Sequence, residues 1–102
     1  MLIALITTSN EEEAVHISRT LVEERLIACA NRIPVRSMYR WKGKIENDQE
    51  VMLICKTTEE HLDKLIKRIK ELHSYDVPEI VAIPVVGGSD DYIKWVEEST
   101  RP

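Results

Sequence analysis

Three side chains in one short segment have the donor types of a metal site. His73, Asp76 and Glu79 follow one another at three-residue spacing. A neutral imidazole beside carboxylates makes a mixed nitrogen and oxygen ligand set, which suits zinc or copper(II) better than copper(I). The same pattern is typical of a loop histidine that bonds to backbone or solvent. Two interpretations therefore stay open here: a weakly bound divalent metal, or a structural imidazole.

The sequence contains no recognisable catalytic motif. Its two cysteines, Cys29 and Cys55, lie in separate apolar segments without CxxC or Cys/His ligand spacing, so we expect two buried, reduced thiols. Neither a GxSxG nucleophile motif nor a phosphate-binding GxxxxGKS/T loop is present, and Gly87-Gly88 indicates only a turn. We expect a protein that is not an enzyme and carries no organic cofactor.

One lysine and two aromatic residues stand at unusual places. Lys56 ends an otherwise apolar strand sequence, so it either reaches the rim or pairs with a carboxylate such as Glu50 or Glu79; a buried pair is the simpler interpretation. Trp41 lies beside a predicted hairpin turn, two residues after Tyr39, where an isolated chain leaves a large aromatic in water. We expect both aromatics to anchor an interface with a neighbouring subunit, the alternative being a wall of a ligand pocket between subunits.

Length and composition fit one compact domain spanning residues 1–102, with 43% hydrophobic and 31% charged residues. The net charge is −4 and the basic residues are dispersed among acidic ones, which disfavours nucleic acid as a partner. No apolar run reaches the roughly 18 residues of a membrane span, so we expect a cytoplasmic protein without a membrane partner. The chain has only four side-chain amides against 32 charged side chains, a bias typical of thermostable proteins.

The first half of the chain reads as a strand, a helix and a long hairpin. Residues 2–8 are nearly continuously apolar, and Ser9 and Asn10 with Glu12 and Glu13 form two overlapping capping boxes. The helix that follows has an apolar stripe at three- and four-residue spacing: Ala14, Ile17, Leu21 and Val22. Residues 27–41 and 44–57 then predict a β-hairpin that turns at Lys42-Gly43, with Pro34 favouring an edge strand or a bulge.

The second half repeats the pattern. Thr57 with Glu60 predicts another capping box. A second apolar stripe follows it: Leu62, Leu65, Ile66, Ile69 and Leu72. We expect a loop over residues 73–78, a strand over 80–86 and a short terminal helix that begins at Ser89.

This βαββαβα order predicts a ferredoxin-like α+β fold, an antiparallel sheet with both main helices on one face. Strand residues 2–6, 51–55 and 80–86 are nevertheless apolar on both faces. Two helices and a short extra one shield about one face, so we expect another copy of the chain to cover the other. The hairpin arms span roughly 40 Å and leave unpaired edges that we expect to pair between subunits.

Four stretches together form a specific combination: Cys29-Ala30-Asn31 leading to Ser37-Met38-Tyr39-Arg40-Trp41-Lys42-Gly43; Glu50 with Lys56-Thr57-Thr58; His73-Ser74-Tyr75-Asp76-Val77-Pro78-Glu79-Ile80; and Asp91-Tyr92-Ile93-Lys94-Trp95-Val96. Along nearly the whole chain they resemble the divalent-cation tolerance (CutA) family. The resemblance implies a cytoplasmic homotrimer of ferredoxin-like subunits, similar in architecture to PII-type signalling trimers and linked to tolerance of copper and other divalent metals. It brings no established catalytic activity.

The resemblance also implies where ligands bind. Family members with a copper site resemble one another in a Cys at the end of the first strand and a His-His pair; here those positions are Ile6, Leu72 and His73, so two of three ligands are missing. In PII-like trimers ligands occupy clefts between subunits, which places Lys56 and Tyr75 near such a cleft. We therefore expect a non-enzymatic homotrimer that binds copper or zinc weakly, the alternative being a PII-like signalling or scaffold module for a small ligand.

Overall fold

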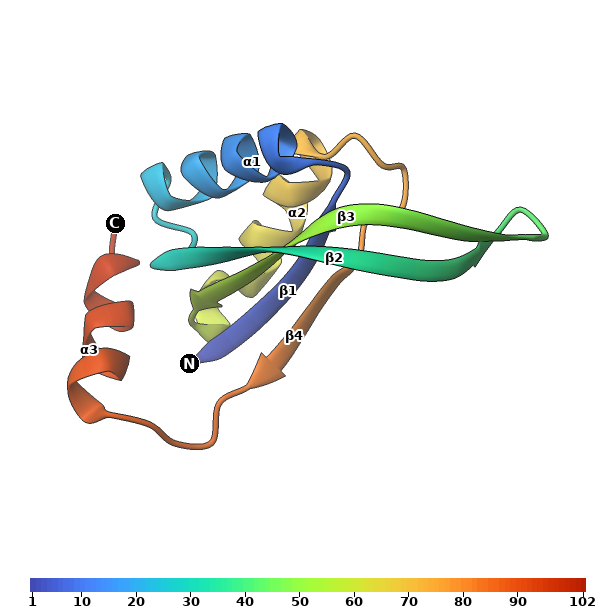
Figure 1. Ribbon diagram of the computed structural model, residues 1–102. Coiled ribbons are helices and arrows are strands. Elements are labelled where there is room, and N and C mark those ends of the chain that lie inside the picture. Colours follow the sequence, from blue (N-terminus) through green and yellow to red (C-terminus); the bar gives the residue numbers. More distant parts are fainter.

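The computed structural model describes residues 1–102 as a four-stranded antiparallel sheet with three α-helices (Figure 1). The strands are β1 (Leu2–Thr8), β2 (Cys29–Trp41), β3 (Lys44–Thr57) and β4 (Ile80–Pro84). The helices are α1 (Glu11–Glu23), α2 (Leu62–Leu72) and α3 (Asp90–Ser99), and a short 3₁₀ turn, η1 (Glu59–His61), precedes α2. The sheet order β2-β3-β1-β4 is that of the ferredoxin-like fold, so the predicted fold class is confirmed.

The hydrophobic core lies between one face of the sheet and helices α1 and α2, which cover the same side (Figure 1). Alternate residues of the two central strands point into it, and each helix contributes residues of its predicted apolar stripe. Its fully buried members include Ala4, Ile6, Ile17, Leu21, Leu53, Cys55, Leu65 and Ile69.

One predicted core position is wrong. Val22 is 42% exposed, whereas Leu26 and Ile27, beyond the end of α1, are buried. Arg25 adopts a left-handed φ of 60°, and the Leu26 N–H donates to the Leu21 carbonyl, which closes the helix and turns the chain back onto the core. Ile27 is consequently buried in the connection, and β2 begins two residues later than predicted, at Cys29.

The predicted capping box at Thr57 is also wrong. Thr57 is fully buried at the end of β3, and its hydroxyl donates to the Leu26 carbonyl at 2.7 Å instead of capping a helix. Thr58 begins the 3₁₀ turn, and its hydroxyl lies 2.6 Å from Nδ1 of His61. A buried hydroxyl needs a hydrogen-bond partner inside the protein. The partner of Thr57 is the carbonyl of Leu26, which is too distant in the sequence for a local motif to predict.

The hairpin of β2 and β3 extends well beyond the rest of the sheet (Figure 1). Its two strands pair without a bulge from Cys29 opposite Lys56 to Trp41 opposite Lys44, whereas β1 pairs only with residues 51–57 of β3. Lys42 and Gly43 both have positive φ, 50° and 79°, as a two-residue hairpin turn requires. Pro34 is in an edge strand, one of the two places predicted for it, because no strand pairs with the free side of β2.

The sheet face opposite α1 and α2 remains partly uncovered. Leu5 lies beside Ile54 and Val81 across the strands, and all three belong to this open face. Val81 and Ile83 are each 48% exposed. Helix α3 packs at the start of β2, where the Tyr92 hydroxyl lies 3.4 Å from Sγ of Cys29, and so leaves the middle of the face open. β4 ends at Pro84, two residues earlier than predicted.

Candidate functional site

His73 follows α2 directly, and its side chain is fully buried. The Tyr75 N–H donates to Nδ1 at 3.0 Å, and Nε2 lies 2.7 Å from the Thr7 carbonyl oxygen. A backbone N–H can only donate and a carbonyl can only accept, so Nδ1 carries the lone pair and Nε2 the hydrogen. His73 is therefore a neutral imidazole that joins the loop after α2 to the end of β1.

This bonding leaves His73 poorly suited to hold a metal. An imidazole coordinates a metal through a nitrogen lone pair, and the lone pair on Nδ1 already accepts the Tyr75 N–H. The chain has no group of three or more His, Cys, Asp or Glu side chains positioned to hold a metal ion. The structure does not bring His73, Asp76 and Glu79 together as a ligand set, and the structural imidazole describes His73 better.

The loop after α2 is also fastened by Glu13, which the sequence indicated only as a capping residue. Asn10 caps α1 by accepting the Glu13 N–H at 2.8 Å, but the Glu13 side chain does not return to Asn10. Its Oε1 accepts both the N–H and the hydroxyl of Ser9, each at 2.9 Å, and its Oε2 accepts the Ser74 N–H at 2.8 Å. Burial alone raises the pKa of Glu13, but the hydrogen bonds from Ser9 and Ser74 outweigh it and lower the pKa to about 2.

A cavity of about 650 Å³ lies between the β2–β3 hairpin and the loop of residues 73–79. We call it the hairpin cleft. Its lining combines aromatic, acidic and hydroxyl side chains: Thr7, Ser37, Met38, Tyr39, Trp41, Lys42, Glu50, Ser74, Tyr75, Asp76, Val77 and Glu79. Five of the residues predicted for a site or an interface line this cleft: Tyr39, Trp41, Tyr75, Asp76 and Glu79. His73 and Lys56 do not.

Tyr75 and Glu50 form the most enclosed polar contact of the cleft. The Tyr75 hydroxyl donates to Oε2 of Glu50 at 2.7 Å, and Glu50 is only 6% exposed. Burial, the hydrogen bond to Glu50 and the nearby negative charges together raise the pKa of Tyr75 far above its ordinary value. The phenol therefore stays protonated and remains a donor. Glu50 entered the sequence analysis as a possible partner of Lys56 and as part of the family resemblance, and no local pattern links it to Tyr75.

The predicted carboxylate partner of Lys56 is wrong. Its ammonium donates to the side-chain oxygen of Asn31, and Glu50 lies six residues away along β3, about 20 Å at the rise of a strand. The prediction failed because Asn31, on the neighbouring strand β2, satisfies the ammonium without a charge. Lys56 does not line the hairpin cleft of the single chain, and its place at a cleft between subunits stays a prediction.

The aromatic residues of the hairpin line the cleft and remain partly in solvent. The Tyr39 hydroxyl donates to Oδ2 of Asp48 at 2.6 Å, and this hydrogen bond, with burial and the Asp48 charge, raises the pKa of Tyr39 to about 12. Trp41 is 45% exposed, and the ammonium of Lys42 lies 5.9 Å from its ring centroid. Within a single chain these rings are a cleft wall, and their exposure is compatible with an interface role.

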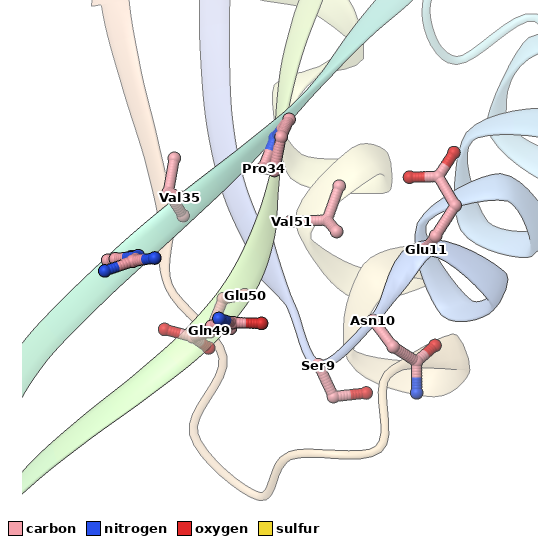
Figure 2. A pocket seen from close by; sticks show the side chains of 9 residues that line it. Ser9, Asn10, Glu11, Pro34, Val35, Gln49, Glu50 and Val51 are labelled. Atoms are coloured by element: carbon pink, nitrogen blue, oxygen red, sulfur yellow. The ribbon is translucent and has the colours of Figure 1, made fainter.

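A second groove lies against the start of α1 and shares Glu50 with the hairpin cleft (Figure 2). Its volume is about 470 Å³, and Figure 2 shows Ser9, Asn10 and Glu11 across the groove from the labelled residues of β2 and β3. Glu11 is committed to an ion pair with Arg32 at 2.7 Å.

Both cysteines are free thiols. Cys55 is buried in the core, and burial raises its pKa to about 12, which makes it an unreactive thiol. Cys29 is only partly buried, beside Tyr92, so the prediction of two buried thiols holds for Cys55 alone. None of the helices is both long and apolar enough to cross a bilayer.

Comparison with known proteins identifies the family. The model of the CutA1 divalent ion tolerance protein family matches residues 2–99. This chain belongs to that family. A divalent-cation tolerance protein CutA from Thermus thermophilus is 48% identical over 99 residues, which are 96% of each chain.

Solved structures agree with this assignment. CutA1 from Pyrococcus horikoshii superposes with a TM-score of 0.96 at 47% identity, over 100% of both chains. A PII-like protein CutA from Nostoc, solved in its apo form, superposes with a TM-score of 0.93 at 40% identity and covers 99% of this chain and 98% of its own. The predicted family and its fold, which a PII-like protein shares, are thereby confirmed.

Proposed function

We propose that this protein is a non-enzymatic homotrimer that contributes to divalent-cation tolerance, and that the hairpin cleft at a boundary between chains is its ligand site. The observation that carries the proposal is the convergence of Tyr75, Asp76 and Glu79 from one loop with Tyr39 and Trp41 from the hairpin. A concave site with aromatic walls and a few polar groups is typical of small-ligand binding.

Assembly is supported by the apolar surface that a single chain leaves exposed. Leu5, Ile54 and Val81 form neighbouring positions of the open face, and the hairpin residues beyond β1 have free backbone edges. Burying such surface against copies of the same chain is favourable, at roughly 25 cal/mol for each Å² of apolar area. The resemblance to PII-type trimers favours three copies.

The charge of the cleft favours a cation. Glu50, Asp76 and Glu79 provide three carboxylates, and Lys42 is the single basic residue of the lining. With no three-ligand set in the chain, a divalent ion would be held weakly, mainly through carboxylate oxygens and its own water shell. This proposal moves the metal role away from His73 and into the cleft.

Calorimetric titration of copper(II) and zinc into the oligomer tests the metal role. We expect weak binding that the double variant Asp76→Asn/Glu79→Gln loses and that His73→Ala retains. The reverse pattern, with binding lost only in His73→Ala, would contradict a metal site in the cleft. If neither copper(II) nor zinc produces heat with the unaltered protein, the cleft has no metal role.

The PII-like neighbour specifically favours a second candidate, a small organic ligand in the same cleft. Such a ligand binds the folded protein and raises its melting temperature by mass action. The organic ligand would be favoured over the divalent metal if the protein binds no metal and if substitutions in the cleft abolish the rise in melting temperature.

A further inference from the structure

We infer that the hairpin cleft binds a small organic cation, a primary amine or diamine on a short alkyl chain, with Glu50 as its principal anchor. The inference rests on the proposed function, because it takes the cleft as the ligand site and names the chemistry of the ligand.

The first observation is the state of the Glu50 carboxylate. Glu50 is more than nine-tenths buried, and Oε2 accepts the Tyr75 hydroxyl. No group of this chain donates a hydrogen bond to Oε1. Every side-chain oxygen that is shielded from solvent does have a hydrogen-bond partner, so Oε1 is open to solvent. Glu50 lines the hairpin cleft and also the second groove beside α1. A carboxylate oxygen that is open to solvent and has no donor of its own in the chain is available to a ligand that brings N–H donors and a positive charge.

The second observation is the charge balance of the lining. Three carboxylates face one ammonium, as described above, so a phosphate or carboxylate ligand meets net repulsion in this chain. A cation is attracted. The lack of a three-ligand set argues against a directly coordinated metal ion as the preferred cation.

The third observation is the pair of aromatic rings. Tyr39 and Trp41 present apolar faces, which suit an alkyl chain and attract an ammonium far better than they accommodate a strongly hydrated metal ion. The chain itself shows this chemistry, because the ammonium of Lys42 lies over the Trp41 ring. Lys42 thus occupies the ring that the ligand would use, and it competes with a bound amine.

The test is calorimetric titration of the intact oligomer with 1,4-diaminobutane, and with 1,4-butanediol as the uncharged analogue. We expect the diamine to bind and the diol not to bind. Glu50→Gln removes the anchoring charge but keeps an oxygen for Tyr75, and we expect it to weaken diamine binding by about tenfold or more. Glu60→Gln, which removes an equal charge from an exposed position in η1, should leave binding unchanged.

A second variant predicts a gain. Lys42→Asn removes the competing ammonium and leaves an Asn-Gly pair, which the positive φ values of this turn favour. We expect the variant to bind 1,4-diaminobutane about two- to fivefold more tightly, and to fold normally because Lys42 is exposed. Unchanged or weaker binding would contradict the competition.

Failure of this inference differs from failure of the proposed function. No diamine binding at millimolar concentration, equal binding of the diol, or full binding by Glu50→Gln with an unaltered melting temperature each overturns the organic cation. If zinc binds in the cleft instead, the ligand class is wrong and the cleft retains its function. A protein that stays monomeric contradicts the proposed function itself.

Discussion

The Glu13→Gln variant tests how the loop that forms one wall of the cleft is held. Glu13 accepts hydrogen bonds from Ser9 and Ser74 and is 13% exposed. Its pKa falls from an ordinary 4.5 to about 2 in the folded chain. A difference of that size corresponds to about 3 kcal/mol of unfolding free energy, and partial screening by water reduces it to about 2 kcal/mol.

The pH window follows from the direction of the pKa change. Because the folded pKa is lower than the unfolded one, the stabilisation by Glu13 is complete above about pH 5 and is lost as the pH falls toward 2. Glu13→Gln should therefore be about 2 kcal/mol less stable than the unaltered protein at pH 7. At pH 2 the two should be nearly equally stable, since the protonated acid and the amide are both neutral.

Urea unfolding at a series of pH values and one fixed chain concentration measures this difference. The matched control is Glu12→Gln, which removes an exposed charge from the same first turn of α1 and takes no part in the hydrogen bonds of Glu13 that hold the loop. We expect the control to lose only a few tenths of a kcal/mol at pH 7. A stability gap for Glu13→Gln that does not change between pH 7 and pH 2 would refute the reasoning.

Three further predictions address the core, the open face and the cleft. Leu65→Ala should lower the free energy of unfolding by about 3 kcal/mol in urea titration, because Leu65 is fully buried; a loss below 1 kcal/mol would contradict its place in the core. Ile54→Lys should leave a folded chain that no longer assembles, seen as a lower mass in analytical ultracentrifugation; an unchanged mass would exclude the open face as the interface. Tyr75→Phe should cost about 1 to 3 kcal/mol at neutral pH by removing the only donor to Glu50, and a neutral effect would show that water replaces it.

Local sequence patterns were sufficient to predict the order and type of the elements. The spacing of Leu65 and Ile69 places both in the core, and Lys42-Gly43 has the chemistry of the turn that joins β2 and β3. Pro34 indicated an edge strand because proline lacks an N–H, and β2 is an edge strand. These features depend on near neighbours in the chain, which a sequence displays directly.

The site was predicted less well because its contacts join distant segments. The sequence singled out Tyr39, Trp41 and Tyr75 because large rings close to turns are conspicuous, and all three line the hairpin cleft. The interface role expected of Tyr39 and Trp41 stays a prediction. For His73 the sequence left a metal ligand and a structural imidazole open, and for Lys56 it favoured a carboxylate partner. The observed partners, a backbone carbonyl in β1 and an amide in β2, lie far away in the sequence. A donor or acceptor that a remote backbone group satisfies leaves no signal in local spacing.

The molecular mass in solution tests the central claim most directly, that copies of this chain cover one another's open sheet face. Multi-angle light scattering at micromolar concentration should give about 35 kDa, three chains of 11.8 kDa each. A stable, folded species of 11.8 kDa under the same conditions would contradict the assembly and the place of the cleft within it.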